Sequence, residues 1–323
     1  MTAGPGGAVR RGGSEGLWAI TSYFNPVGDR RRRDNFRIFR ERLSVPLVAV
    51  ELGFDGRFDL RDGDADILVR LDDGGVMFQK ERLLNLARAH LPPECRHVAW
   101  LDGDILFESD DWSERAVAAL ERHSLVHLFD QVDYMPPGWA GASFEPSEVH
   151  HSRRSLGAAV AGGENAVLAL DRRIAGTHVA IYCKGFAWAA RREVLDRVGF
   201  YDECIVGGGD SALAAAALGD VGYAVRRQGM SPGQENSYRD WARAFGEALD
   251  HGVGAVAGRI FHLWHGGLDS RMYGTRHVGM RRFGYEPAVD LALSESGAWR
   301  WNSSKPEMHD YVASYFAARK EDA

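Results

Sequence analysis

An apolar segment that runs directly into two carboxylates is the feature that most constrains the fold. Residues 97–101, with the sequence His-Val-Ala-Trp-Leu, have the pattern of a buried strand. Asp102-Gly103-Asp104 follows at once, before apolar character resumes at residues 105–107. In open α/β sheets, ligands bind beyond the carboxyl ends of the strands, which is where Asp102 and Asp104 would lie. The segment therefore predicts a sheet that carries a polar site at one edge.

The surrounding chain alternates between strand and helix patterns. Strands are predicted at residues 17–24, 45–52, 66–70 and 125–129, and helices at residues 78–90 and 113–122. Another helix follows the Asn25-Pro26 turn, and we interpret its basic run, residues 30–33, as a solvated face. This order of strand, helix and strand predicts an α/β fold of Rossmann-like type, with a mostly parallel sheet flanked by helices.

The second half of the chain is less regular. Residues 133–177 are rich in Pro, Gly, Ser and His and predict a long irregular loop of the kind that forms lids or binding loops. Regular patterns return in strands at residues 178–183 and 259–264 and in helices at residues 191–198, 211–218 and 306–319. We expect a disordered tail at residues 1–15, a single domain at residues 16–285, and a helical extension packed on it at residues 286–323.

Composition narrows the class of partner. With 39 basic and 45 acidic residues, the net charge of -6 gives no electrostatic reason to expect nucleic-acid binding. The three cysteines are odd in number and widely spaced, so they indicate neither a disulfide framework nor a zinc ribbon. No stretch approaches the ~20 apolar residues of a membrane span. We expect a cytoplasmic protein with a small or neutral partner.

Asp102 and Asp104 are candidate metal ligands, because carboxylate oxygens suit Mg²⁺ or Mn²⁺. The same three residues could form an acidic turn at the surface, so the motif alone is weak evidence. Haloacid-dehalogenase-like phosphatases also carry Asp-x-Asp after a strand. Their motif lies near the N-terminus and precedes small polar residues, whereas Ile105-Leu106-Phe107 follows it here.

Gly207-Gly208-Gly209-Asp210 is a second candidate site. Glycines let the backbone approach a ligand closely, and a carboxylate that opens a helix is held at a defined point. Asp210 is therefore the best candidate for a general base. The alternative is that Asp210 is only the N-cap of the helix that follows.

Two histidines near the end of the last predicted strand form a third candidate site. On a strand, His262 and His265 would point to opposite faces, so we expect only one to bind a metal, and we favour His265 beside Gly266-Gly267. Arg271 and Arg276 follow, and arginines suit a diphosphate through bidentate contacts.

Taken in order, these motifs resemble those of GT-A glycosyltransferases, particularly the galactosyltransferase-like group. The resemblance spans roughly residues 17–276 and includes the segments at residues 100–107, 184–193 and 199–203. Gly207-Gly208-Gly209-Asp210 is similar to the Trp-Gly-Gly-Glu-Asp of that group. Because Gly207 replaces the Trp and a single Asp210 replaces the acidic cluster, galactose is not implied as the donor sugar.

The resemblance implies a bacterial-type, metal-dependent hexosyltransferase with a GT-A fold that uses Mn²⁺ or Mg²⁺. The donor would be a nucleotide sugar, with a UDP-sugar favoured, and the acceptor stays unknown. Asp210 would deprotonate an acceptor hydroxyl, and direct displacement would invert the anomeric centre. If Asp210 instead only positions the acceptor, a retaining route stays open. The implied metal ligands are Asp104 and His265, with Asp102 and His262 as further candidates.

The implied binding residues fall into two groups. Those for the donor are Tyr23, Phe24, Asn25, Lys80, Asn85, Asp102, Gly103, Arg271 and Arg276, and those for the acceptor or sugar are Trp188, Gly208, Gly209 and Asp210. Trp188 could instead be a core residue. A nucleotidyltransferase acting on sugar phosphates is less favoured, because no Gly-rich loop follows the first strand. A non-catalytic nucleotide-sugar-binding protein remains an alternative.

Overall fold

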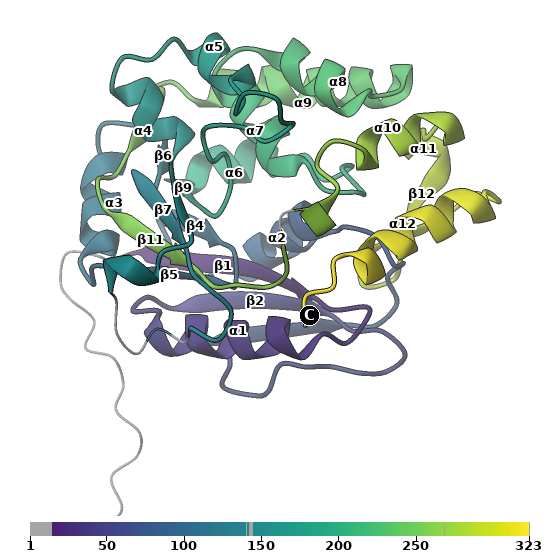
Figure 1. The fold of residues 1–323 in the computed structure, drawn as a ribbon, viewed down its shortest axis with the longest axis horizontal. Helices are drawn as coiled ribbons and strands as arrows, with labels where there is room; N and C mark the ends of the chain where they lie inside the picture. The colour runs from purple at the N-terminus through teal and green to yellow at the C-terminus, as the bar shows by residue number, and fades with distance from the viewer. Residues whose placement is uncertain (1–14, 140, 142–144, 268, 323) are drawn as a thin grey trace, which may run out of the picture.

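A seven-stranded sheet organises the chain (Figure 1). The computed structural model describes residues 15–139, 141, 145–267 and 269–322. In spatial order the strands are β10 (Val253–Ala255), β6 (Leu125–His127), β9 (Ala187–Arg191), β4 (His97–Leu101), β1 (Leu17–Phe24), β2 (Leu47–Leu52) and β3 (Ile67–Leu71). Of these, β9 runs antiparallel to both of its neighbours, and the other pairs are parallel. The predicted α/β fold with a mostly parallel sheet is confirmed.

Helices cover both faces of this sheet because side chains alternate along its strands. In β1, Ala19 packs with Phe36 and Phe39 of α1 (Arg30–Arg42), whereas Ile20 packs on the other face with Leu83 of α2 (Lys80–Ala89). Figure 1 shows α1 below the sheet and the helices α6 to α9 gathered at the opposite side. The strand ends between these layers stay accessible and can carry a site.

The remaining elements are two smaller sheets and a set of helices. The second sheet contains, in order, β5 (Ile105–Phe107), β11 (Arg259–His262), β7 (Gln131–Tyr134) and β8 (His151–Arg154), and a third pairs β12 (Leu291–Leu293) with β13 (Trp299–Trp301). The other helices are α3 (Trp112–Leu120), α4 (Leu156–Ala161), α5 (Ala166–Asp171), α6 (Arg192–Val198), α7 (Gly209–Ala217), α8 (Val221–Gln228), α9 (Pro232–Ala248), α10 (Arg276–Met280), α11 (Pro287–Asp290) and α12 (Pro306–Ala318). Short 3₁₀ helices lie at Pro146–Glu148, Asp269–Arg271 and Arg281–Phe283.

Two local expectations differ from the structure. The predicted strand at residues 178–183 is wrong: this segment makes only isolated bridges, and the strand between β4 and β6 is β9, which begins at Ala187. The expected irregular loop at residues 133–177 is partly regular, since it contains β8, α4 and α5. Ser155 and Asn165 cap these two helices by accepting hydrogen bonds from backbone N–H groups.

Residues 286–322 return to the body of the molecule rather than leaving it. Phe316 of α12 packs edge-on against Phe24 at the end of β1, and the last described residue, Asp322, accepts hydrogen bonds from the first backbone N–H groups of α1. Figure 1 shows the C-terminus beside α1. Among the described residues, no helix is both long and apolar enough to cross a membrane.

Candidate functional site

A cavity of about 290 Å³ opens beyond the carboxyl ends of β1 and β4. It brings together most of the residues that the sequence singled out. These are Phe24, Lys80, Asp102, Gly103, Asp104, Gly208, Gly209, Asp210, His262, His265, Arg271 and Arg276. Most of the predicted site residues therefore line one cavity, at the expected edge of the sheet.

Asp104, His262 and His265 converge at one end of this cavity. Their ligand atoms all lie within 4.8 Å of one another, with His265 Nε2 2.8 Å from Asp104 Oδ2 and 3.1 Å from His262 Nε2. The expectation that the two histidines point to opposite faces is wrong. Strand β11 ends at His262, so the alternation of side chains no longer constrains His265.

The charges in this group suit a divalent cation. Burial favours the neutral form of Asp104, but the charge and hydrogen bond of His265, together with His262, hold its pKa well below the usual range. Burial also lowers the pKa of His262 well below its usual value, which leaves a neutral imidazole, the form that binds metals. Asp104 Oδ1 is buried without a hydrogen-bond partner among the described residues. A cation would satisfy that oxygen.

Lys80 connects the second carboxylate of the strand-end motif to Asp210. Its Nζ lies 2.6 Å from Asp102 Oδ1 and 2.9 Å from Asp210 Oδ1. Burial would lower the pKa of Lys80, but the two carboxylates raise it above its usual value, so the ammonium persists. Burial and the charges of Asp210 and Asp104 raise the pKa of Asp102 to about 6 against the effect of Lys80. Asp102 is thus paired with a lysine, outside the Asp104–His262–His265 group.

Asp210 lies in the first turn of α7 and is not its N-cap. The N-cap is Gly208, whose φ of 107° lies in the region that favours glycine. One carboxylate oxygen of Asp210 contacts Lys80, and the other faces Gly185, where a Cβ would lie 2.5 Å from Oδ2. The alternative that Asp210 serves only as a cap is therefore wrong.

Four of the predicted site residues lie outside the lining of this cavity. Tyr23 and Asn25 both donate hydrogen bonds to Asp59, at a separate hollow of about 40 Å³. Asn85 binds the backbone N–H and C=O of Phe200. Trp188 is 1% exposed and stacks on His127 at a centroid distance of 3.9 Å, so it is a core residue.

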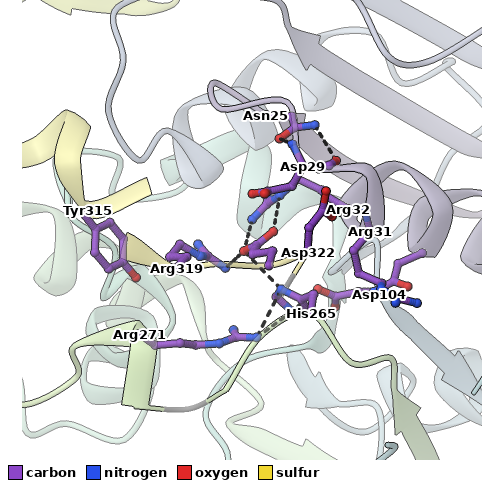
Figure 2. Close-up of polar contacts among 12 residues, drawn as sticks. Asn25, Asp29, Arg31, Arg32, Asp104, His265, Arg271, Tyr315, Arg319 and Asp322 are labelled. Carbon is purple, nitrogen blue, oxygen red and sulfur yellow. Dashed lines mark hydrogen bonds and ion pairs between the residues drawn. The ribbon is translucent and has the colours of Figure 1, made fainter. Parts of the chain in front are cut away.

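The C-terminal segment completes the metal-side end of the cavity. Glu321, which is 1% exposed, lies 3.2 Å from His265 Nδ1, and it accepts two hydrogen bonds from Arg32 at 2.9 and 2.7 Å. The interpretation of residues 30–33 as a solvated face is therefore wrong for Arg32. Figure 2 shows His265 between this segment and Asp104, with Arg271 directed at the imidazole at 2.8 Å from Nε2.

Sequence analysis missed several residues that line the cavity. They are Ser22, Arg32, Glu81, Arg153, Arg173, His178, Lys184, Arg227, His277, Tyr315 and Arg319. They come from distant segments and share no motif. Ser22, Arg32, Glu81, Lys184 and His277 lay inside or beside segments that the sequence singled out, but no pattern in those segments marked them as site residues.

Comparisons with known proteins add distant structural likenesses. No family model and no curated protein matches the chain. Glucosyl-3-phosphoglycerate synthase from Mycobacterium tuberculosis, in complex with Mg²⁺ and uridine diphosphate, is 14% identical, covers 86% of this chain and 83% of its own, and has a TM-score of 0.41. S. aureus TarS in complex with UDP-GlcNAc is 11% identical over 78% of this chain and 59% of its own, with a TM-score of 0.37.

A third similar structure is a mycobacterial protein, 15% identical over 97% of this chain and 94% of its own, with a TM-score of 0.41. TM-scores below 0.5 assign no function, which has to be argued from the site itself.

The buried acid Glu81 predicts a pH-dependent stability. Burial raises its pKa to about 8, against the effect of Lys80, so the folded protein holds a proton that the unfolded chain releases near pH 4.5. This contribution to stability is complete below pH 4.5 and is lost as pH rises through 8. Between pH 5 and 8, we expect the wild type to lose on the order of 1 kcal/mol per pH unit relative to Glu81→Gln. Urea unfolding at several pH values measures this.

The matched control for that experiment is Glu247→Gln, because the Glu247 side chain is 60% exposed on α9. Its difference from the wild type should not change with pH over the same range. Parallel pH profiles for the wild type and Glu81→Gln would show that Glu81 is ionised in the folded protein.

The contact between Glu321 and His265 predicts an effect on metal binding. A carboxylate that binds the second nitrogen of a ligating histidine fixes its tautomer and orientation. We expect Glu321→Gln to weaken Mn²⁺ binding by about 10- to 100-fold in calorimetry. Asp322→Asn is the control, since among the described residues Asp322 forms hydrogen bonds and an ion pair with Arg30 and Arg31 at the start of α1 and none with His265. Equal losses in both variants would mean that attachment of the C-terminal segment, not the histidine contact, matters.

Proposed function

We propose that this protein is a metal-dependent glycosyltransferase that moves a hexose from a nucleotide sugar, with UDP-sugars favoured, to a hydroxyl group of an acceptor. The observation that carries the proposal is that a carboxylate–histidine–histidine group and the separate carboxylate of Asp210 share one cavity at the strand ends. A cation-binding group beside a second carboxylate meets the two needs of the reaction, which are to stabilise a leaving diphosphate and to accept a proton.

Asp104, His262 and His265 would hold the metal. Two imidazole nitrogens in the ligand set favour Mn²⁺ over Mg²⁺, which prefers oxygen ligands. Bound there, the cation supplies Lewis-acid stabilisation of the negative charge on the diphosphate. Arg271, which contacts His265, adds a guanidinium for the phosphate oxygens.

Asp210 would act as the general base. Lys80 holds its Oδ1, which leaves Oδ2 to accept the proton of the acceptor hydroxyl. The hydroxyl oxygen forms a bond to the anomeric carbon as the bond to the diphosphate breaks, and the nucleoside diphosphate leaves with that electron pair. Attack from the side opposite the diphosphate inverts the anomeric centre. Of Tyr23, Phe24 and Asn25, which the resemblance assigns to the donor, Phe24 lines the cavity.

The proposal predicts release of nucleoside diphosphate from one member of a panel of nucleotide sugars, because slow hydrolysis by water needs no acceptor. Release should require Mn²⁺, stop with a chelator, and fall by about 100-fold or more in Asp104→Asn. Asp240→Asn, a charge loss at a side chain that is 72% exposed on α9, should not change it. The absence of release from every donor, or release that chelation does not affect, would contradict the proposal. Transfer of a nucleotidyl group would instead indicate a nucleotidyltransferase.

The role of Asp210 predicts both a rate and a stereochemical outcome. We expect Asp210→Asn to lower the release rate by about 10²- to 10⁴-fold, because a carboxamide cannot accept the proton. Mn²⁺ binding should persist in this variant. NMR of the sugar first released from an α-linked donor should show the β-anomer. Initial release of the α-anomer would exclude direct displacement assisted by Asp210.

A further inference from the structure

The cavity contains a group of cations that the proposed metal chemistry does not use. Arg173, Lys184, Arg227 and Arg276 line it from the segment before β9, from α8 and from α10. We call these four residues the basic wall. Asp171 pairs with Arg173, but among the described residues no carboxylate forms an ion pair with the other three. The wall therefore has an excess of positive charge.

The partners of these three cations are neutral. Lys184 is 8% exposed, and its ammonium lies 5.2 Å from the centroid of the Tyr223 ring. Arg227 donates hydrogen bonds to the backbone carbonyls of His178 and Tyr273. Arg276 donates to the Tyr315 hydroxyl at 2.6 Å, and its buried Nε has no partner among the described residues. Donor capacity is thus left over inside the cavity.

Concentrating these charges is unfavourable without a counter-ion. Burial lowers the pKa of Lys184 to about 8, with the charges of Arg173 and Arg227 acting in the same direction and Cys183 and Asp171 opposing them. Burial and Arg173 also lower the pKa of Arg227. Surface cations would relieve such repulsion by turning into solvent, but Lys184 is enclosed. An anion bound among them would stabilise all of the charges at once.

The wall lies beside Asp210. A Cβ on Gly207 would lie 3.2 Å from Arg276 Nη2, so the turn that leads to Asp210 packs directly on this guanidinium. Asp210 itself faces Gly185, the residue after Lys184. A molecule bound to the basic wall would therefore lie close to the carboxylate of Asp210.

We infer that the acceptor is a hydroxyl compound that carries a phosphate or carboxylate group, which binds to Lys184, Arg227 and Arg276 and places the hydroxyl near Asp210. The identification of this compound as the acceptor rests on the proposed function. The anion-binding site itself is inferred only from the residues of the basic wall. Arg271, which contacts His265, keeps its proposed role toward the donor diphosphate, whereas Arg276, which the sequence resemblance assigned to the donor, is assigned to the acceptor in this inference.

Binding measurements test the anion site without any need for turnover. The probes are inorganic phosphate and three matched three-carbon compounds: glycerol, glycerate and glycerol 3-phosphate. Calorimetry is run with and without saturating UDP and Mn²⁺. We expect glycerate or glycerol 3-phosphate to bind with an affinity at least about tenfold higher than that of glycerol. Whichever of the two binds more tightly indicates whether the site prefers a carboxylate or a phosphate. Equal affinities for all three, or no binding of any anion, would overturn the inference.

Variants locate the site. Lys184→Gln and Arg227→Gln should each weaken anion binding by about tenfold or more, and Lys184→Arg should restore most of it. Arg226→Gln is the matched control, because Arg226 is the neighbour of Arg227 on α8 and its side chain is 73% exposed. Thermal unfolding checks that each variant folds. A loss in Arg226→Gln equal to that in Arg227→Gln would show that only overall charge matters and would overturn the site.

Turnover then separates the two proposals. If the wild type releases no nucleoside diphosphate from any donor, the proposed function fails, and the binding data alone decide the anion site. If release occurs, anionic hydroxyl compounds should be glycosylated and glycerol should not. Glycosylation of glycerol at the rate of the anionic probes would overturn the inference while leaving the proposed function intact.

Discussion

A single buried ammonium holds the centre of the site together. Lys80 starts α2 and bridges Asp102, at the end of β4, to Asp210, at the start of α7. Without this charge, two carboxylates and the neighbouring Glu81 would share a buried region with no cation between them. Removing one partner of a buried ion pair destabilises a protein by about 3–5 kcal/mol, so the geometry of the strand-end motif and that of Asp210 depend on one side chain.

The cavity is lined by two groups of opposite character. Asp104 and two histidines offer a cation its ligands, and Glu321 contacts the second nitrogen of His265 while pairing with Arg32. The basic wall offers an anion its partners. Asp210 shares Lys80 with Asp102 and faces Gly185, the residue after Lys184 of the basic wall. A reaction that joins a metal-bound diphosphate ester to an anionic hydroxyl compound would use both groups.

The parts of the fold that depend on short stretches of sequence were predicted. The buried strand before Asp102 and the parallel order of strands followed from apolar runs and turn residues, and the structure bears them out. The strand expected at residues 178–183 was wrong because its apolar pattern resembles that of β9, and only pairing with β4 and β6 selects between them. Glu321 could not be predicted, since it contacts Arg32, which lies 289 positions earlier in the chain. Of the basic wall, the sequence singled out only Arg276, because the four cations come from separate segments that share no motif.

The glycines before Asp210 have a structural role that the sequence did not indicate. The sequence indicated that they let a ligand approach the backbone. In the structure, a Cβ on Gly209 would overlap the carboxyl group of Glu81, and a residue with a side chain at position 208 would be held at an unfavourable φ of 107°. Glycine is therefore required in this turn because the buried Glu81 side chain leaves no room for a Cβ, whether or not a ligand binds there. Glu81 follows Lys80 on α2. One turn of this helix therefore supplies both the ammonium that pairs with Asp210 and the side chain against which the backbone before Asp210 packs.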